Sequence, residues 1–308
     1  MKRALRFLLL APFLLSGVGC KQTSKNMKPV DVIIISGQSN AVGCTHSSEI
    51  MNWEGNGVEK YSEYQVGYKD MQIAYDCWTL TWNDLGQVTG RVSQNQSRGQ
   101  NFVRIALGQG NGPQTFGPEI GIAEAMHEKY ANKLFLIKFA CGGSSLKGDW
   151  LDKRNSMYPK MMNYIDMQIK NLKDKGYAPT IKAFCWMQGE GDAYPGYHNV
   201  YRDNLNTFVG NLRQDLAKYA PKTGLPFIDA KINPDTEVWP YGPQVNEQKE
   251  AFAAEGDLNI LIDTIAAGMH TDQEPWGNID KCHYDSESEV LLGHLFAEAF
   301  EPFLEPVE

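Results

Sequence analysis

The 308-residue chain has little cysteine and no cysteine pattern typical of a metal centre. Only 6 cysteines are present, with no CxxC pair and no Cys/His spacing of the kind that binds zinc. If Cys20 is modified, as argued below, an odd number remains, so at least one thiol is free or pairs between chains. A disulfide between Cys44 and Cys77 stays open, because no motif supports it. We expect neither a metal nor an organic cofactor.

Positive charge is also scarce. Lys and Arg total 29 against 37 Asp and Glu, which gives a formal net charge of -8. A nucleic-acid-binding face needs basic side chains opposite the phosphates, and electrostatic docking on anionic lipid needs them too. The composition therefore argues against both partners. The hydrophobic content of 42% is typical of an ordinary globular protein. We find neither an internal repeat nor a second domain in the sequence.

The apolar run near the N-terminus is too short to cross a bilayer as a helix, which takes about 20 residues. Here “FLLLAPFLL” follows the basic “MKRALR” and precedes “SGVGC”. Basic, apolar and then small residues form a signal peptide. Its ending resembles a bacterial lipobox with Cys20 as the lipidated residue, although Gly17 stands where Leu is usual. The alternative is cleavage near Gly19 followed by secretion.

On this interpretation residues 1–20 are a lipoprotein-type signal peptide with its lipidation cysteine, and residues 21–29 are a polar tether. The protein is then expected in the bacterial cell envelope, held by lipid in the periplasm or at the outer membrane. Residues 30–308 form a single domain.

Five apolar segments of strand length recur in this domain. They are “DVIIIS” from Asp31, “KLFLIKFA” from Lys133, “IKAFCWMQ” from Ile181, “PFIDAKI” from Pro226 and “LNILIDT” from Leu258. Apart from the more mixed “PFIDAKI”, they are nearly continuous in apolar residues, as parallel strands buried on both faces are. Segments with helical periodicity lie between them. This alternation predicts a doubly wound three-layer α/β fold with a central parallel sheet of about five strands.

Residues 44–115 break the alternation. Within them, residues 70–82 (“DMQIAYDCWTLTW”) predict an edge hairpin, and the polar residues 86–101 predict a surface loop. We interpret the stretch as an insertion after the first strand, on the side of the sheet where ligands bind in such folds. Near the C-terminus, Ser286 and Glu289 are expected to form a capping box at the start of the last helix.

Polar or glycine-rich segments follow three of the strands. Ser39 follows the first strand, Gly142 and Gly143 the second, and Gln188 the third. Because the carboxyl ends of parallel strands meet at one crevice, these residues are expected to converge there. Ser39 becomes a nucleophile if a base takes its proton. The structural alternative for Ser39 is that it only caps a helix, and the alternative for the two glycines is that they only form a tight turn.

His283 is the natural base for Ser39. Asp280 precedes it by three residues, close enough to orient the imidazole and fix its tautomer. Backbone N–H groups of Ser39 and of one glycine, together with the Gln188 amide, are candidates for binding a developing oxyanion. Of the two glycines we choose Gly142, which lies nearer the strand end.

Other polar and aromatic residues carry weaker signals. Asp280, Cys282, His283 and Asp285 are too close in sequence, without distant Cys or His partners, to predict zinc. Five histidines have no supporting motif: His46, His127, His198, His270 and His294. Aromatic residues near the polar segments either stack on sugar rings or pack in the core: Trp150, Trp186, Tyr194, Tyr197 and Trp276.

The motifs “GQSN”, “GGSSL”, “QGEGD” and “DKCH” occur in the order of the sequence blocks of SGNH-type hydrolases. From Val30 to Phe303 the chain resembles the carbohydrate-esterase group that contains acetylxylan esterases and the sialic-acid-specific acetylesterase domain. The resemblance implies a flavodoxin-like α/β/α fold and hydrolysis of acetyl esters on sugars. Ala41 departs from the usual “GQSNM”, which affects packing near the nucleophile.

Carried over by position, the resemblance implies that Ser39 is the nucleophile and that Asp280 and His283 complete the triad. Ser39, Gly142 and Gln188 would form the oxyanion hole, with Gln188 where other SGNH enzymes have Asn. We therefore expect a serine esterase that removes acetyl groups from polysaccharide or sialic acid through an acyl-enzyme. The alternatives are an SGNH hydrolase acting on a non-carbohydrate ester, and a glycan-binding lipoprotein without turnover, which has no need of all three triad residues.

Overall fold

The computed structural model describes residues 27–85, 87–94 and 101–306. Eight strands form one sheet in the order β10-β9-β8-β1-β7-β3-β4, and β5 pairs with β3 outside this path. These strands are β1 (Lys28–Gly37), β3 (Tyr68–Trp82), β4 (Val88–Ser93), β5 (Val103–Ile105), β7 (Leu134–Cys141), β8 (Tyr177–Met187), β9 (Phe227–Ala230) and β10 (Asn259–Ile262). A separate pair joins β2 (Thr45–His46) to β6 (Thr115–Phe116).

All five segments expected to be strands are strands of this sheet, namely β1, β7, β8, β9 and β10. Each pairs in parallel with its neighbours. Numbered along the chain, these five lie in the order 2-1-3-4-5, which is the flavodoxin-like arrangement. Strand β1 lies inside the sheet, and Val32 to Ile35 are fully buried. The expected fold class is confirmed.

The sheet is larger than the expected five strands. Residues Gln72–Trp78 of β3 pair in parallel with β7, and only Trp78–Trp82 form the expected hairpin, with β4. Part of the expected surface loop, Val88–Ser93, is that second hairpin strand. Residues 44–115 are thus partly an extension of the sheet. The pairing of β3 with β7 joins distant segments, so no local pattern could reveal it.

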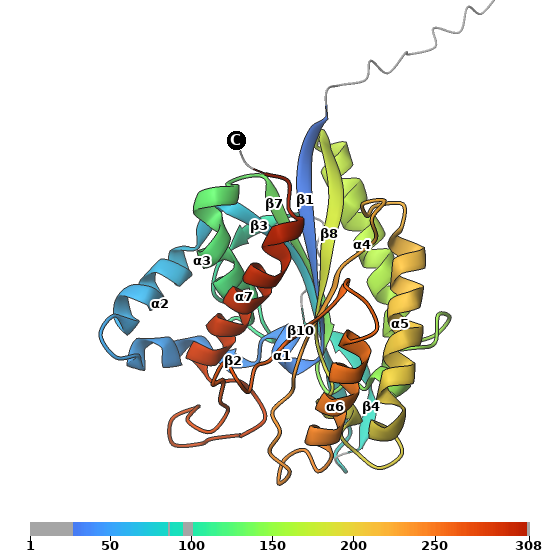
Figure 1. Ribbon diagram of the computed structural model, residues 1–308. Coiled ribbons are helices and arrows are strands. Elements are labelled where there is room, and N and C mark those ends of the chain that lie inside the picture. The colour runs from blue at the N-terminus through green and yellow to red at the C-terminus, as the bar shows by residue number, and fades with distance from the viewer. Residues whose placement is uncertain (1–26, 86, 95–100, 307–308) are drawn as a thin grey trace, which may run out of the picture.

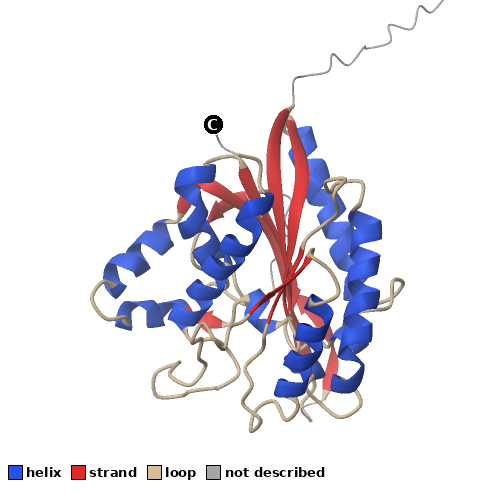
Figure 2. Cartoon of the chain, in the orientation of Figure 1, coloured by secondary structure: helices blue, strands red, loops and turns tan. Residues whose placement is uncertain are grey.

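Helices cover both faces of the sheet, as Figures 1 and 2 show. On one face lie α3 (Glu119–Tyr130) and α7 (Ser286–Phe300), and on the other α4 (Met157–Asp174), α5 (Tyr201–Leu216) and α6 (Gly242–Ala253). The remaining helices are α1 (Ser39–Val42), α2 (Gly57–Val66), a π turn at Leu146–Trp150, and 3-10 turns at Ser47–Asn52, Glu190–Asp192, His198–Val200 and Glu301–Phe303. The backbones of α3 and α7 are in close contact at Gly121, where a Cβ would lie 2.0 Å from the Val290 carbonyl oxygen.

The start of α7 differs from the expected capping box. Ser286 is already helical, and its N–H and hydroxyl each donate to the Glu274 carboxylate at 2.6 Å. The Glu289 carboxyl is fully buried, and neither of its oxygens has a hydrogen-bond partner among the described residues. Burial raises the pKa of Glu289 well above its ordinary value, with the nearby Glu119 carboxylate acting in the same direction. The capping-box prediction is therefore wrong.

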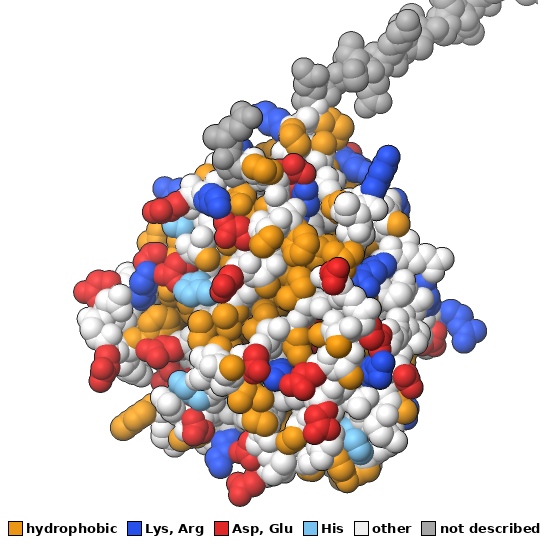
Figure 3. Space-filling view, in the orientation of Figure 1, with side chains coloured by type: hydrophobic (Ala, Val, Ile, Leu, Met, Phe, Trp, Pro, Cys, Tyr) orange, Lys and Arg blue, Asp and Glu red, His pale blue; other side chains and the backbone are white. Residues whose placement is uncertain are grey.

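In the ranges that the structure describes, no helix has the length and apolar character needed to cross a membrane. The predicted lipidation site, Cys20, lies outside those ranges. The strands run toward the lower end of the molecule in Figure 1, where the loops after them gather. Acidic side chains are scattered over the face seen in Figure 3, and some of them lie at that end.

Candidate active site

The three polar segments follow neighbouring strand ends. Gly37 at the end of β1 is level with Ala140 of β7 on one side and with Met187 of β8 on the other. The chain leaves β1 in close contact with β8: Gly37 has φ 141°, and a Cβ there would lie 2.0 Å from the Met187 carbonyl oxygen. Only glycine fits this position. The three segments therefore start side by side at the same end of the sheet.

Ser39 is the first residue of α1 and is partly exposed. Backbone hydrogen bonds hold this short helix together. The N–H groups of Ala41 and Val42 donate to the Gln38 carbonyl, and that of Gly43 donates to the Ser39 carbonyl. Neither the hydroxyl nor the backbone N–H of Ser39 makes a hydrogen bond within the described part of the chain. Both groups are thus open to a bound substrate.

Asp280 and His283 form a closely bonded pair. Asp280 Oδ2 lies 2.6 Å from His283 Nδ1, and Asp280 Oδ1 accepts the backbone N–H groups of Cys282 at 2.7 Å and His283 at 3.0 Å. The intervening Lys281 has φ 58°, so the segment is a tight turn and not a turn of helix. Because Asp280 occupies Nδ1, Nε2 is the nitrogen that remains for proton transfer with Ser39.

The charges of this pair support each other. Burial raises the pKa of Asp280, but the hydrogen bonds from the His283 ring and from the turn outweigh burial and hold that pKa below its ordinary value. Burial lowers the pKa of His283, yet the Asp280 carboxylate outweighs it and raises that pKa above the ordinary range. The nearby Cys44 side chain acts in the same direction on this pKa. The Asp280 carboxylate therefore fixes the orientation of the ring and favours its protonated form.

The segment that carries Ser39 is bonded directly to the segment that carries His283. Asn40 Oδ1 accepts the backbone N–H of Tyr284 at 3.2 Å, and the Thr45 hydroxyl donates to the Tyr284 carbonyl at 2.7 Å. No hydrogen bond joins Ser39 to His283 within the described residues; in enzymes without substrate such bonds are often long and tighten on binding. The sequence motif predicted Ser39 as a site residue, but it did not predict that Asn40 binds the segment of His283.

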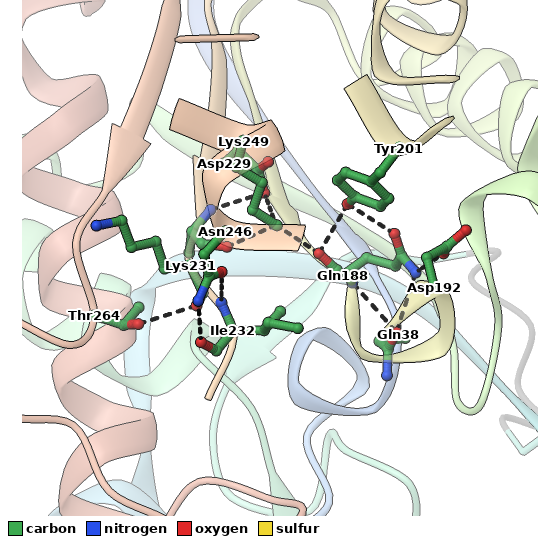
Figure 4. Close-up of polar contacts among 12 residues, drawn as sticks. Gln38, Gln188, Asp192, Tyr201, Asp229, Lys231, Ile232, Asn246, Lys249 and Thr264 are labelled. Atoms are coloured by element: carbon green, nitrogen blue, oxygen red, sulfur yellow. Dashed lines mark hydrogen bonds and ion pairs between the residues drawn. The ribbon is translucent and has the colours of Figure 1, made fainter. Parts of the chain in front are cut away.

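Gln188 does not face the crevice. Its side chain is fully buried, and Nε2 donates to Asp192 Oδ2 at 2.7 Å and to Gln38 Oε1 at 3.2 Å. Its Oε1 accepts the Tyr201 hydroxyl at 3.0 Å, and its backbone carbonyl accepts Lys249 Nζ at 2.6 Å (Figure 4). The amide hydrogens are thus used within the protein, and no substrate can reach them. The prediction that Gln188 is an oxyanion donor is contradicted.

The choice of Gly142 as a donor is also contradicted. The Gly142 N–H donates to the Trp78 carbonyl at 2.8 Å and so continues the pairing of β7 with β3. The next residue, Gly143, is exposed with φ 63°, and its N–H has no hydrogen-bond partner among the described residues. Gly143 is therefore the glycine whose N–H is free to bind an oxyanion.

Two cavities with shared lining residues lie on the His283 side of the site, and they are named inner and outer here. The inner cavity, about 40 Å³, is lined by Cys44, Thr45, His46, Glu49, Glu274, Pro275, Asp280, His283 and Tyr284. The outer cavity, about 420 Å³, is lined by Glu49, Asn52, Trp53, Glu54, His270, Gln273, Glu274, Trp276 and Glu287. Glu49 and Glu274 line both. His270 lines the outer cavity, although no motif in the sequence marks this residue.

His270 belongs to a cluster with Asp272 and Asp285, whose side-chain ligand atoms lie within 4.8 Å of one another. Asp285 already accepts three hydrogen bonds, from His270 Nδ1 at 2.5 Å and from the N–H groups of Gln273 and Glu274. Its carboxylate therefore holds the loop closed. We assign no metal to this cluster.

Comparison with known proteins identifies the family. Residues 29–301 match the family model described as “Carbohydrate esterase, sialic acid-specific acetylesterase”. The chain belongs to this family. It is thus a carboxylic ester hydrolase of the carbohydrate esterases, as the four sequence motifs indicated. No curated protein matches the chain.

Three solved structures share the fold. A protein from Arabidopsis thaliana aligns with TM-score 0.57 and 21% identity, covering 90% of this chain and 100% of that one. NanS aligns with TM-score 0.55 and 13% identity, covering 91% and 98%. A carbohydrate acetylesterase from Xanthomonas citri aligns with TM-score 0.50 and 15% identity, covering 89% of this chain and 56% of that one. At these identities the likeness shows the fold alone.

Proposed function

We propose that this carbohydrate esterase removes O-acetyl groups from sugars through an acyl-enzyme formed at Ser39. The observation that supports the proposal is the geometry around His283. Its Nδ1 lies 2.6 Å from Asp280, and the next residue, Tyr284, is bonded at 3.2 Å to Asn40, which follows Ser39. The nucleophile and an oriented base are thereby held on adjacent segments.

In the first step the Ser39 oxygen bonds to the acetyl carbonyl carbon while His283 Nε2 takes the hydroxyl proton. The oxyanion that forms is bound by the N–H groups of Ser39 and Gly143. The bond from the acetyl carbon to the sugar oxygen then breaks, and His283 donates the proton to that oxygen. In the second step His283 takes a proton from water while the water oxygen bonds to the acetyl carbon. The bond from that carbon to the Ser39 oxygen then breaks, and His283 returns the proton to Ser39. The acetic acid that leaves ionises to acetate in solvent.

Ser39→Ala tests this function. The variant should lose at least about 10³-fold in acetate release from an aryl acetate and from a peracetylated sugar, because the covalent route is removed. It should also fail to react with a fluorophosphonate probe while keeping the wild-type melting temperature. Ser48→Ala, a change of an exposed serine nearby, is the control and should behave as wild type. Near-wild-type turnover by Ser39→Ala would refute the assignment.

We also propose that Cys20 carries a lipid that holds the protein in the cell envelope. The order of basic, apolar and small residues before Cys20 supports this. Metabolic labelling with a radioactive fatty acid should mark the wild-type protein, and Cys20→Ser should be unlabelled and released from membranes. If the wild-type protein takes up no label, cleavage near Gly19 and secretion are the correct account.

A further inference from the structure

The outer cavity is placed to receive the sugar that carries the acetyl group. It shares Glu49 and Glu274 with the inner cavity, and the inner cavity is lined by Asp280 and His283. In the proposed mechanism His283 protonates the leaving sugar oxygen, so the sugar lies on the His283 side of the ester, where these two cavities are. A volume of about 420 Å³ lies in the range of small-molecule sites.

The lining of the outer cavity is acidic. It contains Glu49, Glu54, Glu274 and Glu287, and neither cavity is lined by a lysine or arginine among the described residues. The histidine in the outer cavity, His270, is paired with the Asp285 carboxylate. The acidic groups also affect one another. Burial raises the pKa of Glu274, and the charges of Asp285 and Glu49 act in the same direction against hydrogen bonds from Ser286.

The same cavity presents aromatic surface. Trp276 is 85% exposed, so core packing does not explain it. Trp53 is held in place, because its indole N–H donates to the Ser286 hydroxyl at 2.7 Å and its ring packs edge-on against Tyr64. Aromatic faces pack against the apolar faces of pyranose rings, and carboxylates accept hydrogen bonds from sugar hydroxyls. These two features fit a sugar with hydroxyls and no negative charge.

We infer that the outer cavity is a subsite for an uncharged pyranose and that it rejects acidic sugars, sialic acid included. This inference rests on the proposed function and specifies its substrate class. A sugar carboxylate in this cavity would face up to four glutamates without a cationic partner. Like charges brought together at a binding site weaken binding and suppress the wrong ligand.

The charge of the sugar is tested with a matched pair of substrates. We would measure release of acetate from O-acetylated sialic acid and from its carboxamide, which has the same shape without the charge. The carboxamide should be hydrolysed with a kcat/KM at least about tenfold higher. The difference in kcat/KM between the carboxamide and the acid should become smaller as ionic strength rises, because salt screens exposed charges. Equal rates, or faster hydrolysis of the acid, would overturn the inference.

The cavity itself is tested by charge reversal. Combined Glu54→Lys and Glu287→Lys, both exposed cavity residues, should raise the ratio of acid to carboxamide kcat/KM at least about tenfold. Glu128→Lys makes the same charge change on the exposed face of α3, away from the cavity, and should leave the ratio unchanged. A ratio that does not respond to the cavity variants would show that the discrimination lies elsewhere.

Failure of the proposed function gives a different result. A protein that releases no acetate from an aryl acetate or from any acetylated sugar is not an esterase of this kind. The subsite is then tested by calorimetry with deacetylated sialic acid and its carboxamide. Tighter binding of the carboxamide supports an uncharged subsite, and tighter binding of the acid overturns it.

Discussion

Asn40 Oδ1 accepts the backbone N–H of Tyr284 at 3.2 Å across a separation of 244 residues. Asn40 follows the nucleophile and Tyr284 follows the base, so one buried amide sets the distance between the two reacting groups. The other end of the amide donates to Glu190 Oε1 at 2.9 Å, which ties in the loop after β8. Asn40 is thus a positioning residue for all three segments of the site.

Replacing Asn40 with Ala should lower kcat by about 10- to 100-fold with little change in KM, because a small displacement of His283 from Ser39 spoils proton transfer. Stability should fall by about 1–3 kcal/mol, since the Glu190 carboxylate loses a buried partner. The rate of fluorophosphonate labelling of Ser39 separates the two effects. A folded variant that labels at the wild-type rate would show that Asn40 serves stability alone.

The sequence allowed the central fold to be predicted because its five strands are buried on both faces, and such strands are continuous apolar runs. Strand β3 was recognised only as a hairpin. Its parallel pairing with β7 depends on contacts between segments about 60 residues apart, which no periodicity encodes. The capping box at Ser286 failed for a related reason, since Glu274 from another loop binds that serine.

In the site, the short motif predicted the Asp280–His283 contact because both residues lie in one turn. The oxyanion donors were not predictable in this way. Whether a glycine N–H is free depends on how far the β3–β7 pairing extends, and it reaches Gly142. Gln188 was misassigned because its partners come from other elements of the fold. His270 had no neighbouring motif at all.

Gln188→Ala should destabilise the protein by about 2–4 kcal/mol, because it leaves a cavity and removes partners from the buried Asp192 and Tyr201 side chains. Thermal unfolding measures this loss. Gln244→Ala, an exposed change on α6, is the control and should be neutral. If the Gln188 variant unfolds like wild type but loses 10²-fold or more in kcat, its amide acts on the oxyanion after all.

Glu289→Gln should stabilise the protein, and increasingly so as pH rises. Burial raises the pKa of Glu289, so the folded state keeps a proton that the unfolded state releases above the ordinary pKa. In that window wild-type stability falls by up to about 1.4 kcal/mol per pH unit from this group, and glutamine removes the effect. Unfolding in urea at several pH values measures the difference. The control is Glu287→Gln, an exposed change in the same helical turn, which should show no pH-dependent gain in the free energy of unfolding. If the free energies of unfolding of wild type and Glu289→Gln run parallel against pH, the argument is contradicted.

Asp280 determines both the orientation and the basicity of His283. Burial lowers the pKa of the imidazole, but the hydrogen bond and charge of Asp280 raise it above its ordinary value. The reaction needs the neutral ring as proton acceptor. The acidic limb of kcat/KM against pH therefore lies higher in the wild-type enzyme than an ordinary histidine would place it.

Asp280→Asn removes the negative charge and keeps the size of the side chain. The acidic limb should move to lower pH, while the maximal rate falls by about 10³–10⁴, because an asparagine no longer stabilises the imidazolium or fixes its tautomer. The measurement is kcat/KM for an aryl acetate across the pH range in which the protein stays folded. Asp272→Asn is the matched control: it makes the same change in the same exposed loop and should leave both the limb and the maximal rate in place. An Asp280→Asn limb that stays at the wild-type pH would mean that another group sets the pKa of His283. Cys44, which acts on that pKa in the same direction as Asp280, would be the residue to test.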